Sequence, residues 1–267
     1  MKRLTASQET QALEFVELLA RSVGDKIAQK TSRRKHISFK GEVDLVTQFD
    51  REAQRLILKA LRKHYPDFGI LSEEDVNQHA DRPIKWIVDP LDGTTNFAHG
   101  LPIWAISIAL EVQGAISLGV VYDPNRGEMF SGLKNRGARL NGKRIHVSTT
   151  RRLEHSLLVT GFPYDIRRSK ENNLRQFSTF AVRARAVRRL GSAALDLCYT
   201  ACGRFDGYWE LKLSPWDQAA GALIVHEAGG RITDFSGRRF DIYGDEVLGT
   251  NGKIHHQMMR VLQGSAN

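Results

Sequence analysis

One short segment, from Trp86 to Asn96, restricts the fold of this chain more than any other stretch of its sequence. The apolar residues near its start, over 85–89, predict a short strand that ends in a carboxylate, Asp89. Pro90 disfavours helix at the residue before it and stiffens the turn. Asp92 lies three residues after Asp89, so both carboxylates can face one point. Because α/β sheets commonly build their sites at such strand ends, the segment predicts a sheet with a site at its edge.

The residues after this strand end have the chemistry of a phosphate site. Gly93 lets the backbone approach a ligand closely, and Thr94 and Thr95 offer hydroxyls and amides at an expected helix start, where backbone amides bind phosphate well. Two carboxylates beside such amides describe a site for Mg²⁺ and phosphate, because hard divalent cations take oxygen ligands. An Asx-turn followed by a helix N-cap would also explain Asp92-Gly93-Thr94, so both interpretations stay open at this point.

Three other acidic clusters stand beside predicted turns or strand ends. They are Asp44-Leu-Val-Thr-Gln-Phe-Asp50, Glu73-Glu74-Asp75 after an apolar strand, and Trp216-Asp217-Gln-Ala-Ala-Gly221 at the head of an apolar helix. Taken singly, the second could be plain surface charge, and Asp217 could be a helix N-cap. Their occurrence together with the 89–96 segment favours one shared site.

Hydrophobic periodicity predicts a chain in which helices flank a central sheet and then alternate with strands. Thr5 and Gln8 predict a capping box for the first helix. Helices are predicted over 6–29, 51–65, 172–186, 192–201, 216–228 and 255–262, with a loop over 31–36. Strands are predicted over 85–89, 105–112, 116–122, 128–133, 139–147, 156–161, 205–210, 231–235 and 247–250, with turns at 113–114 and 141–142. We therefore expect an α/β (α+β) fold in one compact unit, with subdomains 1–147 and 148–267.

Composition excludes several other classes of protein. Of the 267 residues, 41% are hydrophobic and 26% are charged, unlike disordered, collagen-like or coiled-coil chains. The longest apolar stretch, Ile103–Val112, is broken by Ser107 and Glu111 and falls short of the ~20 residues that span a bilayer. No apolar run follows Met1-Lys-Arg, so we expect no secretory signal.

The cysteines and histidines give no sign of a metal centre of their own. Cys198 and Cys202 are too few for a disulfide scaffold. Their spacing of four suits one face of a helix, as small core residues or, alternatively, as a metal or redox pair. A reducing cytoplasm is the simplest compartment for such a chain. His255-His256 is expected on the surface of the last helix.

The net charge of +9 suggests an anionic partner. Much of the excess lies between Asp165 and Arg189, where two acidic residues are outnumbered by Arg167, Arg168, Lys170, Arg175, Arg183, Arg185, Arg188 and Arg189. This segment is interpreted as a solvated or dimer-facing helix, or alternatively as a surface that docks nucleic acid or protein.

Together, the four clusters resemble the inositol monophosphatase family. Its two signature motifs are similar to Asp-Pro-Leu-Asp-Gly-Thr-Thr-Asn at 89–96 and Trp-Asp-Gln-Ala-Ala-Gly at 216–221. Asp44–Asp50, Glu73-Glu74, Gly191-Ser192-Ala193, Glu210 and Glu227-Ala-Gly-Gly230 follow in the expected order. The resemblance implies a Mg²⁺-dependent, Li⁺-sensitive phosphomonoesterase with a layered αβαβα fold, usually a homodimer.

The resemblance also implies roles for individual residues. Glu73, Asp89 and the carbonyl of Leu91 would hold one Mg²⁺ ion, Asp89, Asp92 and Asp217 a second, and Glu73 with waters a weaker third. Gly93 and Thr94 would bind the phosphate, and Asp50 would bond Thr94 and help to position the attacking water, supported by Glu74. Asp92, the amide of Ala193, Glu210 and Asp217 would contact the polyol.

The expected reaction is hydrolysis of myo-inositol-1-phosphate by in-line attack of a metal-activated water. The chain has no Gly-x-Ser-x-Gly, Walker-type or His-Glu-x-x-His motif, which agrees with a reaction that needs no side-chain nucleophile. Thr94-Thr-Asn-Phe97 resembles the inositol-phosphate branch, and Glu210 suits hydroxyl recognition. Two alternatives stay open: a broader sugar phosphatase that includes fructose-1,6-bisphosphate, and a regulatory protein that contacts RNA or the transcription machinery through residues 165–189.

Overall fold

The computed structural model describes residues 4–30, 37–39, 45–74 and 76–264. The loop expected over 31–36, the Met1-Lys-Arg start, Asp44 and Asp75 lie outside these residues. A short antiparallel pair joins β1 (Ile37–Phe39) to β2 (Leu45–Thr47).

Within the described residues, eight strands form a first sheet in the order β10-β9-β8-β7-β6-β5-β3-β4. Their bounds are β3 (Gly69–Ser72), β4 (Val76–Gln78), β5 (Ile84–Asp92), β6 (Ala105–Val112), β7 (Ala115–Asp123), β8 (Glu128–Leu133), β9 (Ala138–Leu140) and β10 (Lys143–Arg144). The predicted hairpin with its turn at 113–114 is present as β6 and β7. Strand β5 is longer than predicted, and it forms with β3 the one parallel pair among the described strands of this sheet.

A second, five-stranded sheet follows in the described chain, in the order β12-β11-β13-β15-β14. Its strands are β11 (Leu157–Thr160), β12 (Ala186–Arg188), β13 (Gly207–Leu211), β14 (Arg231–Thr233) and β15 (Glu246–Thr250). The prediction of helix up to Ala186 was wrong at its end. Helix α4 (Leu174–Arg183) stops because Ala184 turns extended and the amides of Arg185 and Ala186 bond to Ser156.

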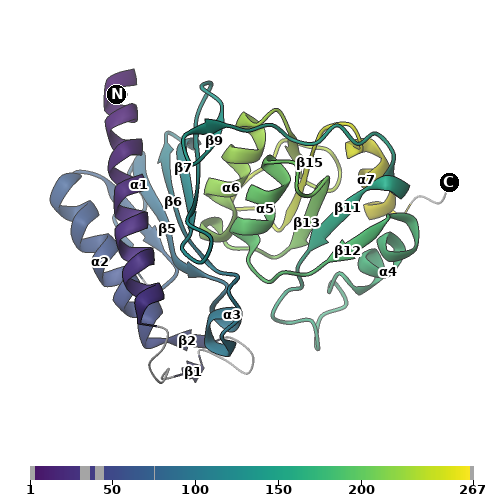
Figure 1. Cartoon of the computed structure of the whole chain (residues 1–267), viewed down its shortest axis with the longest axis horizontal. Helices are drawn as coiled ribbons and strands as arrows, with labels where there is room; N and C mark the ends of the chain where they lie inside the picture. Colours follow the sequence, from purple (N-terminus) through teal and green to yellow (C-terminus); the bar gives the residue numbers. More distant parts are fainter. Residues whose placement is uncertain (1–3, 31–36, 40–44, 75, 265–267) are drawn as a thin grey trace.

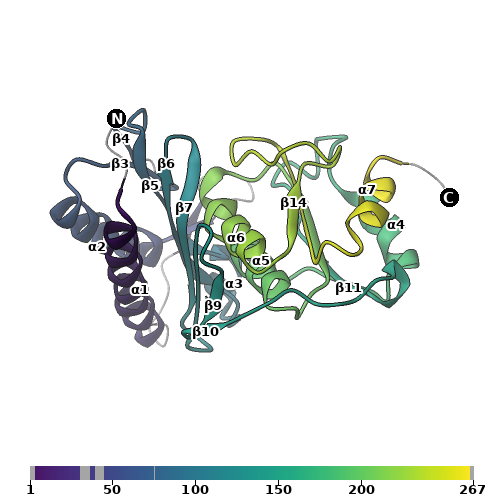
Figure 2. The same ribbon diagram turned by 90° about the horizontal axis from the view of Figure 1, so that it is seen from above.

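Helices cover both outer faces and fill the space between the sheets (Figures 1 and 2). On the outside of the first sheet lie α1 (Ala6–Gln29) and α2 (Gln48–His64). Between the sheets lie α5 (Ala193–Ala201) and α6 (Pro215–Glu227), and α4 with α7 (His255–Leu262) covers the far face of the second sheet. The predicted αβαβα layering is confirmed. The boundary expected near residue 148 stays a prediction, because α5 and α6 follow it in the chain yet pack against strands that precede it.

The core between the sheets depends on small residues. The Cα of Gly119 on β7 faces Ala220 on α6 so closely that an added Cβ would lie 2.8 Å from the Ala220 Cα. This contact lets α6 approach the first sheet with almost no side chain between them. Cys198 is buried in the same core and Cys202 is partly buried at the end of α5. Burial raises the pKa of the Cys198 thiol well above its usual range, which suits the interpretation of this pair as small core residues.

Three details of the helices bear on the predictions. The capping box of α1 between Thr5 and Gln8 is present. Asp217 is not the N-cap of α6: Ser214 caps the helix, and Asp217, three residues on, completes the box by accepting the Ser214 amide at 2.7 Å. His255 is buried rather than on the surface, because its two ring nitrogens lie 3.0 and 2.9 Å from the hydroxyls of Thr233 and Thr250.

Among the described residues, no helix is long and apolar enough to cross a membrane.

Candidate active site

A bulge in β5 turns two aspartates toward the same region. Asp89 pairs with Ser107 of β6, but Asp92 pairs with Ala105, so β5 has one residue more than its partner between the two pairs. In a regular strand, residues three apart would point to opposite faces. The extra residue reverses the alternation. Asp89 is 1% and Asp92 8% exposed, so this end of the strand carries two buried acids.

The parallel neighbour of β5 brings Glu73 to the same end of the sheet. Ser72 pairs with Val88, and the amide of Glu73 donates to the Val88 carbonyl at 3.3 Å. Buried Gln54 on α2 holds the segment: its amide nitrogen donates to the Glu74 carbonyl at 2.8 Å, and its oxygen accepts the Ser72 hydroxyl at 2.6 Å. Glu73 and Glu74 are therefore placed by backbone contacts on both sides.

The third aspartate comes from the helix layer between the sheets. Asp217 lies in the first turn of α6 and is partly exposed. The Ser107 hydroxyl on β6, opposite Asp89, donates to the Trp216 carbonyl at 3.3 Å. This bond ties the start of α6 to the strand beside β5.

Helix α5 supplies the donors that hold Asp92. Ser192 is the N-cap residue of α5. The Asp92 Oδ2 accepts hydrogen bonds from the Ser192 hydroxyl at 2.5 Å and from the Ala194 amide at 2.9 Å. The Ala193 and Leu195 amides also lower the pKa of Asp92. The start of a helix therefore faces this carboxylate, as expected from the partial positive charge of its free amides.

A short helix, α3 (Thr94–His99), begins directly after Asp92. Its N-cap Gly93 has φ 95° and faces the Ile103 carbonyl so closely that a Cβ would lie 2.9 Å away. The Thr94 hydroxyl lies 2.9 Å from Asp50 Oδ1 and 3.1 Å from the Leu91 carbonyl. Asn96 fastens the helix to the next layer by donating to the Leu190 carbonyl at 2.7 Å.

Neighbouring acids destabilise the charged forms of Asp89 and Asp217. Burial first, and then the charges of Glu73, Asp92 and Asp217, hold the pKa of Asp89 well above its usual range. Burial and the charges of Asp92 and Glu73 do the same for the pKa of Asp217. Burial raises the pKa of Asp92 to about 6, although the bond from Ser192 opposes the shift. Repulsion among these carboxylates favours a bound cation.

The donor set fits Mg²⁺ in its chemistry. Carboxylate oxygens and a main-chain carbonyl are what hard divalent cations take, and a cation would relieve the repulsion just described. The described hydrogen bonds engage Oδ1 of Asp89 and Oδ2 of Asp92 and Asp217. No three His, Cys, Asp or Glu side chains of the described residues are grouped tightly enough to hold an ion.

Glu210 of β13 lies in a tight recess. Its carboxylate is 8% exposed and accepts the Tyr208 hydroxyl at 2.7 Å. A Cβ on Gly161 would collide with this carboxylate, because it would come within 2.3 Å of the Glu210 Cδ. Burial raises the pKa of Glu210 to about 7, and the charge of Asp92 adds to that shift.

Sequence reasoning missed three residues around this site. Gln54 gave no signal, since a glutamine within a helix is ordinary. Gly161 could have been noticed as a glycine at the end of a strand. Asp196 is a single acid in the otherwise apolar start of α5 and was the clearest signal. It is 1% exposed, its Oδ1 has no hydrogen-bond partner among the described residues, and burial, followed by the charges of Glu210 and Asp92, raises its pKa.

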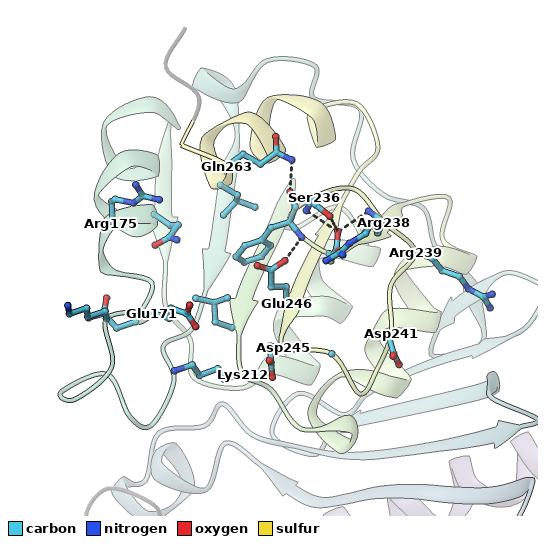
Figure 3. A pocket seen from close by; sticks show the side chains of 18 residues that line it. Glu171, Arg175, Lys212, Ser236, Arg238, Arg239, Asp241, Asp245, Glu246 and Gln263 are labelled. Carbon is cyan, nitrogen blue, oxygen red and sulfur yellow. Dashed lines mark hydrogen bonds and ion pairs between the residues drawn. The ribbon is translucent and has the colours of Figure 1, made fainter.

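A separate cavity of about 990 Å³ lies beside the second sheet (Figure 3). None of the predicted site residues lines it. Two of its acids have clear partners: Glu246 accepts the Phe235 amide at 3.0 Å, and Asp234 accepts Arg238 Nε at 2.6 Å. Paired charges of both signs do not form a reactive cluster, so the carboxylates around β5 remain the candidate site.

Comparisons with known proteins find relatives along almost the whole chain. The model of the inositol monophosphatase family matches residues 8–266. The chain is 44% identical over 252 residues to an inositol-1-monophosphatase of Synechocystis sp., covering 94% of this chain and 88% of the relative. It is 40% identical over 243 residues to Nus factor SuhB of Escherichia coli, covering 90% and 91%. The solved inositol monophosphatase from Anabaena has a TM-score of 0.88, with 39% identity and 96% of each chain covered.

Proposed function

The chain belongs to the inositol monophosphatase family, a family of phosphatases, and from that premise we propose that it is a Mg²⁺-dependent phosphomonoesterase that prefers myo-inositol-1-phosphate. The observation that carries the proposal is the set of Glu73, Asp89, Asp92 and Asp217, four acids from three parts of the fold. After burial, the charges of the other acids of this set raise the pKa of Asp89, and those of Asp92 and Glu73 raise the pKa of Asp217. A fold that tolerates this repulsion needs a cation to relieve it.

The metal would be held by the residues expected from the resemblance. Glu73, Asp89 and the Leu91 carbonyl would hold one ion, Asp89, Asp92 and Asp217 a second, and Glu73 a weaker third. When bound, Mg²⁺ supplies charge against the phosphate and a more acidic water.

Thr94 and Asp50 provide a path for the water's proton. The Thr94 hydroxyl is within 2.9 Å of a carboxylate oxygen of Asp50, which is fully buried. As water attacks phosphorus, we expect Thr94 Oγ1 to accept its proton while passing its own to Asp50. The ester bond opposite the attacking oxygen breaks, the leaving oxygen takes a proton from solvent water to give the alcohol, and Asp50 returns its proton to solvent. The amides of Gly93 and Thr94 would donate hydrogen bonds to the phosphate oxygens. Glu74 would not bind the metal itself but would help to position Glu73.

The alcohol part of the substrate would be recognised by a second group of residues. Asp92, Asp217, the Ala193 amide and Glu210 offer several hydrogen-bond partners, which suits a polyol. The raised pKa of Glu210, to about 7, is consistent with a carboxyl that gains hydroxyl partners only when substrate binds.

The test is phosphate release from myo-inositol-1-phosphate, fructose-1,6-bisphosphate, adenosine 3′,5′-bisphosphate and glycerol-2-phosphate. Each is measured with Mg²⁺, with EDTA, and with Mg²⁺ plus Li⁺. We expect release that needs Mg²⁺, is inhibited by Li⁺ and is fastest with the inositol phosphate. Faster release from fructose-1,6-bisphosphate would replace the substrate by the broader sugar-phosphatase alternative. Release that persists in EDTA would overturn the metal assignment.

Glu210 offers a sharper test of substrate choice. Glu210→Ala should lower kcat/KM for the inositol phosphate at least 10-fold and that for an aryl phosphate less than 3-fold, because the aryl group has no hydroxyl for Glu210 to accept. The matched control is Glu171→Ala, which removes an exposed glutamate and should change neither. Equal losses with both substrates would remove Glu210 from substrate recognition.

We also propose that the chain acts as a cytoplasmic homodimer. The exposed side chains of Tyr164, Leu174 and Val182, the last 84% exposed, offer apolar surface near the basic segment. Light scattering should give twice the chain's mass, and Val182→Asp should shift the mass toward the monomer.

A further inference from the structure

The outer face of α2 carries an unbroken row of cations. Its members recur at three- or four-residue spacing and all are exposed: Arg51, Arg55, Lys59, Arg62 and Lys63. In the part of the chain that the structure describes, none of them has an ion pair. The one acid in the middle of this helix, Glu52, is turned away toward α1, where it binds Lys30 at 2.5 Å.

The row borders a shallow groove. Its volume is about 400 Å³, and Arg51, Arg55, Lys59 and Arg62 line it together with Gln54 and Leu58. Among the described residues, no acidic side chain lines this groove. Because an α-helix rises 1.5 Å per residue, the cations stand about 6 Å apart and the row is about 18 Å long. Such a row of like charges, with no partner within the described protein, is stabilised when an external polyanion binds it.

We infer that this row binds the phosphate backbone of a nucleic-acid duplex. One strand of B-DNA advances about 3.4 Å per phosphate, so about 18 Å of helix spans about five phosphates, as many as the row has cations. The row is straight and rigid, like a duplex.

The same face argues against other partners. Single-strand binding relies on aromatic side chains that stack on bases, and no aromatic residue lines the groove. Insertion into a membrane requires an exposed apolar face. The large exposed hydrophobic residues all lie on other elements. With nothing to read a base edge, binding should be independent of sequence and strongly dependent on salt.

The basic segment 165–189, the candidate from sequence, lacks this regularity. Its Asp165 binds Lys212 at 2.7 Å, and its arginines are spread over α4, β12 and the loops around them. Exposed Leu174 and Val182 interrupt the charge. It lies at the opposite end of the molecule from α2 (Figure 1). The segment therefore provides a matched control from which the same number of positive charges can be removed.

The experiment is fluorescence anisotropy with a labelled 24-base-pair DNA duplex of mixed sequence, titrated with the full chain between 50 and 200 mM salt. The test variant is Arg51→Gln, Arg55→Gln, Lys59→Gln, Arg62→Gln, since glutamine keeps the helix propensity. The control is Arg175→Gln, Arg183→Gln, Arg185→Gln, Arg188→Gln. Circular dichroism and thermal midpoints verify that each variant is folded.

Five phosphate contacts predict a log–log salt slope of about −4.5 for the wild type, because each contributes about −0.9. The test variant should lose at least 30-fold in affinity at 50 mM salt and about 3.6 in slope, while the control changes less than 3-fold. Three results would overturn the inference: no wild-type binding at 50 mM salt, an equal or larger loss in the control, or displacement of the duplex by poly-glutamate at equal charge. The last would assign the row to an acidic protein.

Discussion

Asp206 and Asp89 are both buried aspartates, and the structure treats them in opposite ways. Asp206, beside the second sheet, accepts the Ser148 hydroxyl at 2.5 Å on one oxygen and the Leu157 amide at 2.7 Å on the other. Asp89, in the first sheet, has one bond from the Leu91 amide and otherwise faces the charges of Glu73, Asp92 and Asp217.

The difference separates an acid that holds the fold from an acid that holds a ligand. A buried charge that meets donors on both oxygens is compensated within the protein. A buried charge that meets other acids is compensated only by something added. Burial and charge alone therefore do not tell a ligand-binding acid from a structural one. The groups that surround the carboxylate make that distinction. Four changes would break or sharpen this comparison.

The largest effect is expected from Asp92→Asn, on the ligand side. The asparagine keeps the size of the side chain and an oxygen for Ser192 and Ala194, but it removes one negative charge from the site. We expect phosphate release to fall at least 10³-fold while the metal-free protein unfolds at the same urea concentration or a higher one. Activity within 10-fold of the wild type would show that the repulsion at this end of β5 has no catalytic purpose.

Asp206→Ala should act in the opposite manner. It leaves the Ser148 hydroxyl and the Leu157 amide without their acceptor, which costs about 3 kcal/mol of unfolding free energy. Urea denaturation measures the loss, and phosphate release per folded molecule should stay within 3-fold of the wild type. A variant that unfolds like the wild type but has lost its activity would place Asp206 with the ligand-holding acids instead.

Adding Mg²⁺ tests the same contrast without mutation. At 100 times its dissociation constant, a ligand that binds only the folded state adds about 2.7 kcal/mol of stability, or a rise of about 5 °C in the thermal midpoint for a chain of this size. Asp217→Asn should abolish most of the rise and Asp206→Asn should preserve it. Ca²⁺ and monovalent cations, added at the same ionic strength, serve as controls for general salt effects.

The smallest effect is expected from pH, at a buried group that is neutral. Burial lowers the pKa of His255 to about 4. The unfolded chain binds a proton near pH 6.5 and the folded chain does not, so this stability is present above pH 6.5 and is lost as pH falls toward 4. We expect a loss of about 2 kcal/mol after allowing for solvent screening. His255→Gln should remove this pH dependence, and His256→Gln, in an exposed neighbour, should not.

The order of helices and strands could be predicted from periodicity, because each face of an element reports its own burial. The acids of the site could be grouped because each stands at a strand end or helix start. The bulge between Asp89 and Asp92 could not be predicted, since it depends on how β6 pairs with β5. Strand β12 was missed because its three residues continue a helical pattern, and only the pairing with β11 makes them extended. His255 was misplaced because its partners, Thr233 and Thr250, come from two other strands.

Gly119 is two strands away from Asp89 and touches no acid of the site, yet the gap between the acids depends on it. Ala220, which faces it, follows Asp217 by one helical turn. A methyl group at Gly119 would push α6 away from the first sheet. The helix would tilt and carry Asp217 away from the strand that holds its partners. The spacing of the acids is therefore set by the absence of a side chain at Gly119. A substitution there would lower the activity although every acid of the site is still present in the sequence.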